Sequence, residues 1–124
     1  MKSLLDVSTL VALIIEGHEF NQRANDWLSG KKLALCAISE LGFLRVAALA
    51  YGVELSAARE ALQQFKGDHK PEFLPCDVSA LQGRESPSAA KTTDYYLANL
   101  AEKHGMKWAT LDTGIKHPAA VIVR

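Results

Sequence analysis

Four acidic residues stand where an isolated charge is unexpected. Asp6 interrupts the apolar run LLDVSTLVALI, and Asp112 ends another in WATLDTGI. Glu40 follows the apolar segment LALCAIS, and Asp94 opens the amphipathic segment DYYLANLAEKH. Carboxylate oxygens suit Mg²⁺ and Mn²⁺, and carboxylates gathered at one place must bind protons or cations, because they repel one another. The commonest chemistry of such a metal site is in-line displacement at phosphorus.

The segments around these acids predict a sheet that positions them. Five short apolar runs are typical of strands: 2–7, 33–38, 72–77, 106–112 and 119–123. Amphipathic segments predict helices at about 9–16, 20–28, 40–50, 57–65 and 94–104. Mostly apolar strands that alternate with helices indicate a parallel sheet covered on both faces. We therefore expect one three-layer α/β domain over residues 1–124, with a central, mostly parallel sheet flanked by helices.

In a parallel sheet, strands end and the following helices begin at one edge, where ligands bind in open α/β folds. Asp6 and Asp112 fall at strand ends, whereas Glu40 and Asp94 fall in first helical turns. Taken singly, these acids have ordinary explanations, because acids favour first helical turns and Asp is a common turn former. A shared metal ion is favoured because all four acids are expected at the same edge of the sheet.

Hydroxyl residues suggest where the helices begin, because a hydroxyl can satisfy a free N–H of the first turn. We expect Ser8 or Thr9, then Ser39, then Thr92 or Thr93, to cap the helices that follow them. Helix 40–50 is expected to bury one side, formed by Leu41, Leu44, Ala48 and Leu49.

Two further expectations concern the third strand and the cysteines. Pro75 places the third strand at the edge of the sheet, because proline cannot donate to a central ladder. Cys36 and Cys76 lie in apolar contexts without metal-ligand spacing, so both are expected to be buried free thiols.

Composition limits the classes of function. Lys plus Arg and Asp plus Glu each number 14, so the formal charge is zero and the chain lacks the basic footprint of a pure polyanion binder. Hydrophobic residues make up 48% of the chain, enough for a core. The first apolar run is too short to span a bilayer, and no signal peptide is evident, so we expect a cytoplasmic protein with no membrane contact.

The chain also resembles PIN-domain ribonucleases of the VapC type, the toxins of bacterial toxin–antitoxin pairs. The resemblance rests on LLDVSTLVAL, AISELGFLRV and TTDYYLANLAEKHGMKWATLDTGI and covers essentially all 124 residues. It implies a PIN-like fold and a hydrolase that cuts RNA with Mg²⁺ or Mn²⁺. It also implies a homodimer inhibited by a cognate antitoxin protein.

The family's catalytic and metal-binding acids would fall on Asp6, Glu40, Asp94 and Asp112, the acids that the edge argument selects. Whether Glu40 binds metal directly or orients a water as a base stays open. Ser8 and Thr110 are candidates for hydrogen bonds that orient the acids. Relatives often carry Asn at the position of Ser8, and often a basic residue at that of Thr113.

Two surfaces are expected around the acids. Lys91, Lys107, Lys116 and His117 could form a basic rim for the RNA backbone. An antitoxin would lie in an apolar groove around Leu10, Leu13 and Trp27 and present an arginine, which pairs bidentately with carboxylates.

Other α/β classes fit less well. A phosphoacceptor receiver needs adjacent acids after the first strand, and a haloacid-dehalogenase-like phosphatase needs a second Asp where Ser8 stands. The serious alternative is a non-catalytic PIN-like module that uses the acids to bind a metal or a protein.

Overall fold

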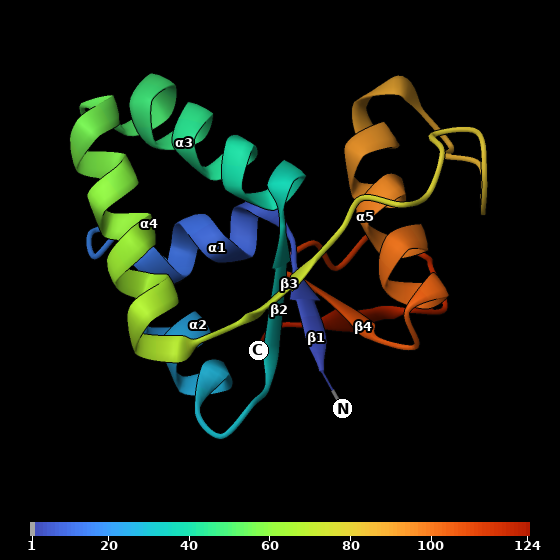
Figure 1. Cartoon of the computed structure of the whole chain (residues 1–124), viewed down its shortest axis with the longest axis horizontal. Helices are drawn as coiled ribbons and strands as arrows, with labels where there is room; N and C mark the ends of the chain where they lie inside the picture. The colour runs from blue at the N-terminus through green and yellow to red at the C-terminus, as the bar shows by residue number, and fades with distance from the viewer. Residues whose placement is uncertain (1) are drawn as a thin grey trace.

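A single parallel sheet organises the chain. The computed structural model describes residues 2–124 (Figure 1). Its strands are β1 (Ser3–Leu5), β2 (Leu33–Cys36), β3 (Glu72–Leu74), β4 (Lys107–Thr110) and β5 (Ala120–Ile122). They are hydrogen-bonded in the order β3-β2-β1-β4-β5, and every neighbouring pair is parallel. β3 lies at the edge, as Pro75 indicated.

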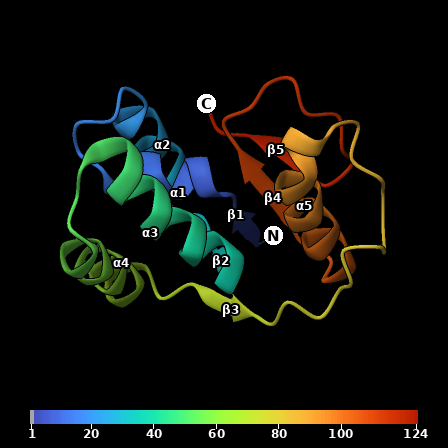
Figure 2. The same ribbon diagram turned by 90° about the horizontal axis from the view of Figure 1, so that it is seen from above.

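Helices cover both faces of this sheet. They are α1 (Val7–Ile14), α2 (Asn21–Leu28), α3 (Ala37–Tyr51), α4 (Leu55–His69) and α5 (Thr92–Lys103), with a short 3₁₀ helix η1 (Ala89–Lys91) before α5. Figure 2 shows α1 to α4 on one side and α5 on the other. The prediction of a three-layer α/β fold is confirmed. None of the helices within residues 2–124 has the length and apolar character needed to cross a membrane.

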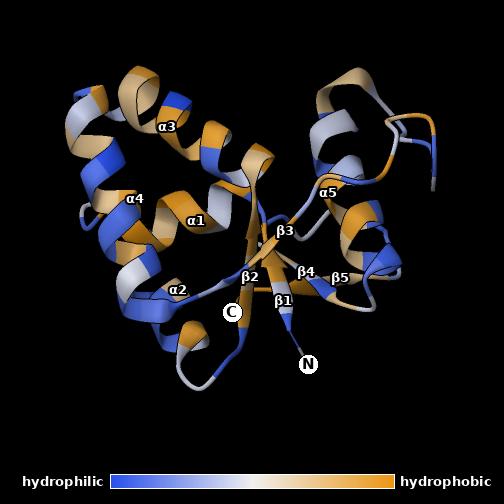
Figure 3. Ribbon diagram, viewed as in Figure 1, coloured by the Kyte–Doolittle hydropathy of each residue, from blue (hydrophilic) through white to orange (hydrophobic). Residues whose placement is uncertain are grey.

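The strands supply apolar side chains to both layers because successive residues point to opposite faces. Leu5 and Leu35 pack with α1 to α4, whereas Leu4 and Ala34 pack with α5. All four side chains are fully buried. The apolar strands at the centre of Figure 3 are therefore covered on both faces, which explains their lack of polar alternation.

The register places the ends of β1 and β4 side by side. Leu5 pairs with Ala109, and the N–H of Asp6 donates to the Ala109 carbonyl at 3.1 Å. The first residue after β1 thus lies beside the last residue of β4, Thr110. This is the carboxyl edge of the sheet, where ligands bind in folds of this class.

The expected helix caps at Ser8, Thr9 and Ser39 are wrong. Asp6 is the N-cap of α1, and its carboxylate accepts the N–H of Thr9 at 2.7 Å. α3 begins at Ala37, directly after β2, so Ser39 lies inside the helix and donates to the Leu5 carbonyl at 2.8 Å. In α1, the Asp6 carboxylate takes the capping position that was expected for a hydroxyl. α3 begins earlier than expected because β2 ends at Cys36, before the end of the apolar run 33–38.

The cap expected before α5 is also wrong. Lys91 occupies the N-cap position without a side-chain hydrogen bond, because α5 continues directly from η1. Thr92 is already helical, and its hydroxyl donates to the Ala89 carbonyl at 2.9 Å.

The expected buried side of α3 is wrong as well. Its fully buried residues are Ser39, Phe43 and Ala47, whereas Leu41 is 60% exposed and Leu49 is 80% exposed. α3 is apolar around most of its circumference, so the sequence pattern does not define one inward side.

One cysteine also departs from expectation. Cys36 ends β2 and is buried, but Cys76 follows the edge strand β3 and is exposed. Only Leu74 of β3 is buried, so the apolar run 72–77 marks an edge strand more than a core strand.

Candidate metal centre

A cavity of about 560 Å³ opens at the carboxyl edge and unites three of the four expected acids. Its lining includes Asp6, Asp94 and Asp112, which come from the junction of β1 and α1, from α5 and from the turn after β4. Ser8 and Lys91 add polar groups, and an apolar wall lies beside them, formed by Val7, Val11, Phe20, Val46 and Leu111.

Asp6 is the most deeply placed of these acids, with only 2% of its surface exposed. Besides the Thr9 N–H, its carboxylate accepts from the Ser8 hydroxyl at 3.1 and 3.2 Å. Burial raises the pKa of Asp6, while hydrogen bonds from Thr110, Thr9 and Ser8 act in the opposite direction. The carboxylate is therefore held in a fixed orientation but is costly to ionise without a nearby cation.

Asp94 lies half-buried in the first turn of α5. Burial is the largest cause of its raised pKa, and the negative charges of Asp6 and Asp112 raise it further. Its carboxylate is absent from the ion pairs formed within residues 2–124. Asp94 thus experiences the negative charges of Asp6 and Asp112 but forms no ion pair of its own within the described residues.

Asp112 follows β4 and forms a turn in which its Oδ1 accepts the N–H of Gly114 at 2.8 Å. Its Oδ2 lies 2.5 Å from the Nζ of Lys91. The Lys91 ammonium is the largest cause of the lowered pKa of Asp112. One lysine thus compensates part of the negative charge of the cavity.

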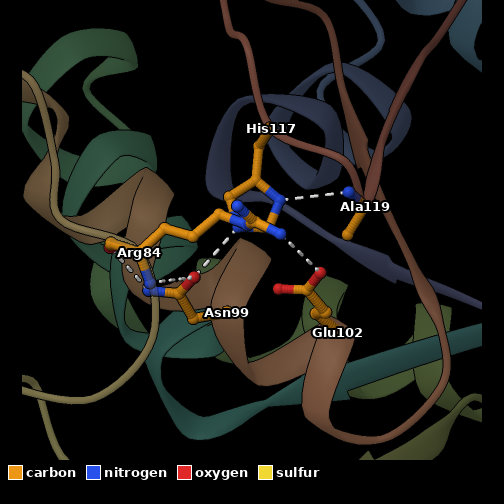
Figure 4. Close-up of polar contacts among 5 residues, drawn as sticks. All are labelled: Arg84, Asn99, Glu102, His117 and Ala119. Carbon is orange, nitrogen blue, oxygen red and sulfur yellow. Dashed lines mark hydrogen bonds and ion pairs between the residues drawn. The ribbon is translucent and has the colours of Figure 1, made fainter.

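The segment after Asp112 is tied to α5 through His117 and Asn99 (Figure 4). The Nδ1 of His117 accepts the N–H of Ala119 at 3.0 Å, so the ring proton lies on Nε2 and donates to the Asn99 Oδ1 at 2.9 Å. The same Asn99 donates through Nδ2 to the Arg84 carbonyl at 3.0 Å. Asn99 therefore joins two loops to the helix that carries Asp94.

The sequence reading missed Asn99. The signal available was a polar residue inside LANLA, on a face of α5 that is otherwise buried and apolar. Asn99 is 7% exposed, and a buried amide needs partners that only the folded chain supplies.

Glu40 lies apart from the three aspartates. It sits in the first turn of α3, and its carboxylate pairs with Lys66 of α4 at 2.5 Å. It lines a separate cavity between α3 and α4, together with Leu44 and Leu62. The structure therefore brings together Asp6, Asp94 and Asp112 but not Glu40.

The expected basic rim is not formed as a group. Lys91 lines the cavity with the aspartates, but Lys107 begins β4 and so lies at the opposite edge of the sheet. His117 is 7% exposed and faces Asn99 rather than solvent. Lys107 and His117 therefore do not join Lys91 at the aspartate cavity.

The expected antitoxin groove is wrong in its residues. Leu10, Leu13 and Trp27 belong to the core between α1, α2 and the sheet, and none is more than 8% exposed. Apolar surface does adjoin the acids, but it is the cavity wall described above, whose partly exposed members are other residues, such as Val7 and Phe20.

Comparison with known protein families matches residues 3–121 to the PIN domain. The chain belongs to the PIN-domain family. Within that family it is similar to proteins of the VapC group from Mycobacterium tuberculosis. Ribonuclease VapC29 is 33% identical over 122 residues, which cover 94% of this chain and 90% of that protein. Ribonuclease VapC44 is 33% identical over 93% of this chain and 89% of that protein, and Ribonuclease VapC38 is 30% identical over 91% and 86%.

The donor set of this PIN domain fits a hard divalent cation. Asp6, Asp94 and Asp112 offer only oxygen, and two of them have raised pKa values that a bound cation would reverse. As they stand, no three acidic, histidine or cysteine side chains in the described part of the chain are grouped to hold one ion. Binding one ion would thus require these carboxylates to approach one another.

Proposed function

We propose that this PIN domain is a metal-dependent endoribonuclease that hydrolyses phosphodiester bonds in RNA as the toxin of a toxin–antitoxin pair. The observation that carries the proposal is the single cavity that unites Asp6, Asp94 and Asp112. The proposal is also supported by similarity to Ribonuclease VapC29, to which this chain is 33% identical over 94% of its length.

The three aspartates have distinct tasks in this proposal. Asp6 is the fixed ligand, because three neighbouring hydroxyl or amide groups orient its carboxylate. Asp94 and Asp112 complete an oxygen site for Mg²⁺ or Mn²⁺. When bound, such an ion offsets charge on the phosphate and lowers the pKa of water. Ser8 and Thr110 keep Asp6 oriented, as outer hydrogen-bond donors commonly do.

Glu40 is the weakest member of the expected set. Its ion pair with Lys66 turns it towards the α3–α4 cavity rather than the aspartates. We therefore assign metal binding to the three aspartates, without Glu40.

The partners proposed are RNA, an antitoxin and a second copy of the chain. The apolar wall beside the aspartates suits an antitoxin segment that carries apolar side chains and one arginine, because arginine pairs bidentately with carboxylates. Leu41 and Leu49 leave apolar surface on α3, which supports a homodimer contact through that helix.

One experiment separates the nuclease from the alternative, a non-catalytic PIN-like module. The purified chain is incubated with mixed RNA in Mn²⁺, in Mg²⁺ and in chelator, beside the variant Asp6→Asn. We expect RNA fragments with either metal and none with chelator or with the variant. Metal binding by a folded protein that leaves all RNA intact would support the binding module instead.

A further inference from the structure

Lys91 has an unusual position for a surface lysine. Among the described residues that line the aspartate cavity, it is the only lysine or arginine. It ends η1 and is the N-cap of α5, so it lies three residues before Asp94 on the same structural unit. Its Nζ lies 2.5 Å from the Asp112 Oδ2, while its side chain remains 40% exposed.

The charge of Lys91 acts on more than its direct partner. The hydrogen bond and charge of Asp112 are the main causes of the raised pKa of Lys91, and the charge of Asp94 adds to them. In return, Lys91 opposes the rise in the pKa of Asp94. One ammonium thus partly neutralises two of the carboxylates assigned to the metal.

The contact also uses the oxygen that a metal would need. The Asp112 Oδ1 accepts the N–H of Gly114, which leaves Oδ2 as the outward oxygen, and that atom is the one paired with Lys91. An ammonium and a divalent ion cannot share this position, because both are cations that seek the same oxygen. The flexible four-carbon stem lets the ammonium leave without backbone movement.

We propose that Lys91 is the built-in counter-ion of the metal centre, which a divalent ion displaces from Asp112 and thereby frees to contact the phosphate of RNA. The inference rests on the proposed metal centre. Lys91 offsets part of the charge of Asp112 and Asp94 before metal binds, and it becomes a substrate-binding residue afterwards.

Metal binding without RNA tests the first half of this proposal. Mn²⁺ affinity is measured by calorimetry for the wild type, Lys91→Met and Lys91→Arg. Lys107→Met serves as the matched control, because Lys107 is an exposed lysine at the opposite edge of the sheet. Competition predicts that Lys91→Met binds Mn²⁺ about fivefold more tightly, the upper range for an exposed ion pair. Lys91→Arg and Lys107→Met should resemble the wild type.

Salt separates this direct contact from a general change of charge. The affinity gain of Lys91→Met should persist in 0.5 M salt, because the Debye length there, roughly 4 Å, still exceeds the 2.5 Å between the ammonium and its carboxylate. A gain that disappears in high salt, or that Lys107→Met reproduces, overturns the competition. Lys91→Gln repeats the measurement with a polar side chain in case the methionine variant fails to fold.

RNA binding tests the second half. In Mn²⁺, Lys91→Met should raise the KM for RNA severalfold, whereas Lys107→Met should leave it unchanged. An unaltered KM overturns the phosphate contact. If the wild type itself binds no Mn²⁺, the metal centre fails and this inference fails with it. If the wild type binds Mn²⁺ and every lysine variant binds it equally, only the role of Lys91 is refuted.

Discussion

The hydroxyl of Thr110 accepts the backbone N–H of Asp112 at 3.0 Å, and the same hydroxyl stabilises the carboxylate of Asp6. Thr110 ends β4, so one fully buried side chain connects the two acids that terminate neighbouring strands. The relative position of Asp6 and Asp112 therefore depends on an interaction inside the sheet edge rather than on exposed loops.

Replacing this hydroxyl should weaken the metal centre. Thr110→Val keeps the shape but removes the donor to Asp6, so the already raised pKa of Asp6 should rise further. We expect Mn²⁺ affinity to fall severalfold at pH 7, and more at pH 6, where the protonated carboxyl competes better. Titration at both pH values measures this. The exposed neighbour substitution Thr113→Val is the control, and an equal loss there would contradict the role of Thr110.

Glu40→Gln tests whether Glu40 is a metal ligand. Because Glu40 pairs with Lys66 outside the aspartate cavity, Mn²⁺ affinity should stay unchanged. Loss of a partly exposed ion pair should cost at most about 1 kcal/mol of unfolding free energy. Calorimetry and urea unfolding measure the two effects. A drop in Mn²⁺ affinity as large as that of an aspartate variant would make Glu40 a ligand after all.

His117 should make stability depend on pH. Burial is the main cause of its lowered pKa, which the charge of Arg84 lowers further and that of Glu102 opposes. His117 therefore binds a proton more readily in the unfolded chain than in the folded one. Its full contribution to the free energy of unfolding is present above the ordinary pKa of 6.5 and is lost as pH falls below that value. Urea unfolding at pH 8, 6 and 5 should show this loss.

His117→Gln should be less stable at pH 8 but lose less stability on acidification. His69→Gln is the matched control, since His69 is an exposed histidine on α4. If wild type and His117→Gln lose the same stability between pH 8 and pH 5, the buried neutral imidazole is not the cause.

The two cysteines should be dispensable for metal-dependent cleavage. Cys36→Ser should lower the melting temperature, because Cys36 is fully buried, whereas Cys76→Ser should leave it nearly unchanged. Neither thiol lines the aspartate cavity. RNA cleavage normalised to folded protein checks this, and lost turnover in well-folded Cys76→Ser would mean that the site has been misassigned.

The sequence was sufficient to predict the sheet and the placement of three acids because both follow from short-range patterns. Asp6 and Asp112 directly follow apolar strands, and Asp94 lies in the first turn of a helix with clear amphipathic spacing. A parallel sheet then brings such positions to one edge without further information.

The placement of Glu40 was not predictable in the same way. The expected helix began at Glu40, but α3 begins at Ala37. Three residues correspond to most of one helical turn, so the start of the helix decides which direction a side chain faces. The nearly uniform apolar character of α3 conceals that start.

The Asn99–His117 contact was not predictable either. It depends on residues 18 positions apart, which only tertiary structure brings together.

The central claim is that Asp6, Asp94 and Asp112 exist to bind a cation, and Asp94→Asn tests it without RNA. Asp94 has a raised pKa in the folded chain, so its ionisation costs stability at neutral pH. Removing the charge should therefore leave the melting temperature in chelator unchanged or higher. A mere helix-capping role predicts instead a loss of about 0.3–1 kcal/mol.

The decisive measurement is the rise in melting temperature that Mn²⁺ causes in wild type, in Asp94→Asn and in the control Asp68→Asn, which changes an exposed acid of α4. A ligand that binds only the folded state raises the melting temperature of the protein, by an amount that grows with the logarithm of its affinity. We predict a clear rise for the wild type and the control and little or none for Asp94→Asn. An equal rise in all three proteins would contradict the metal centre.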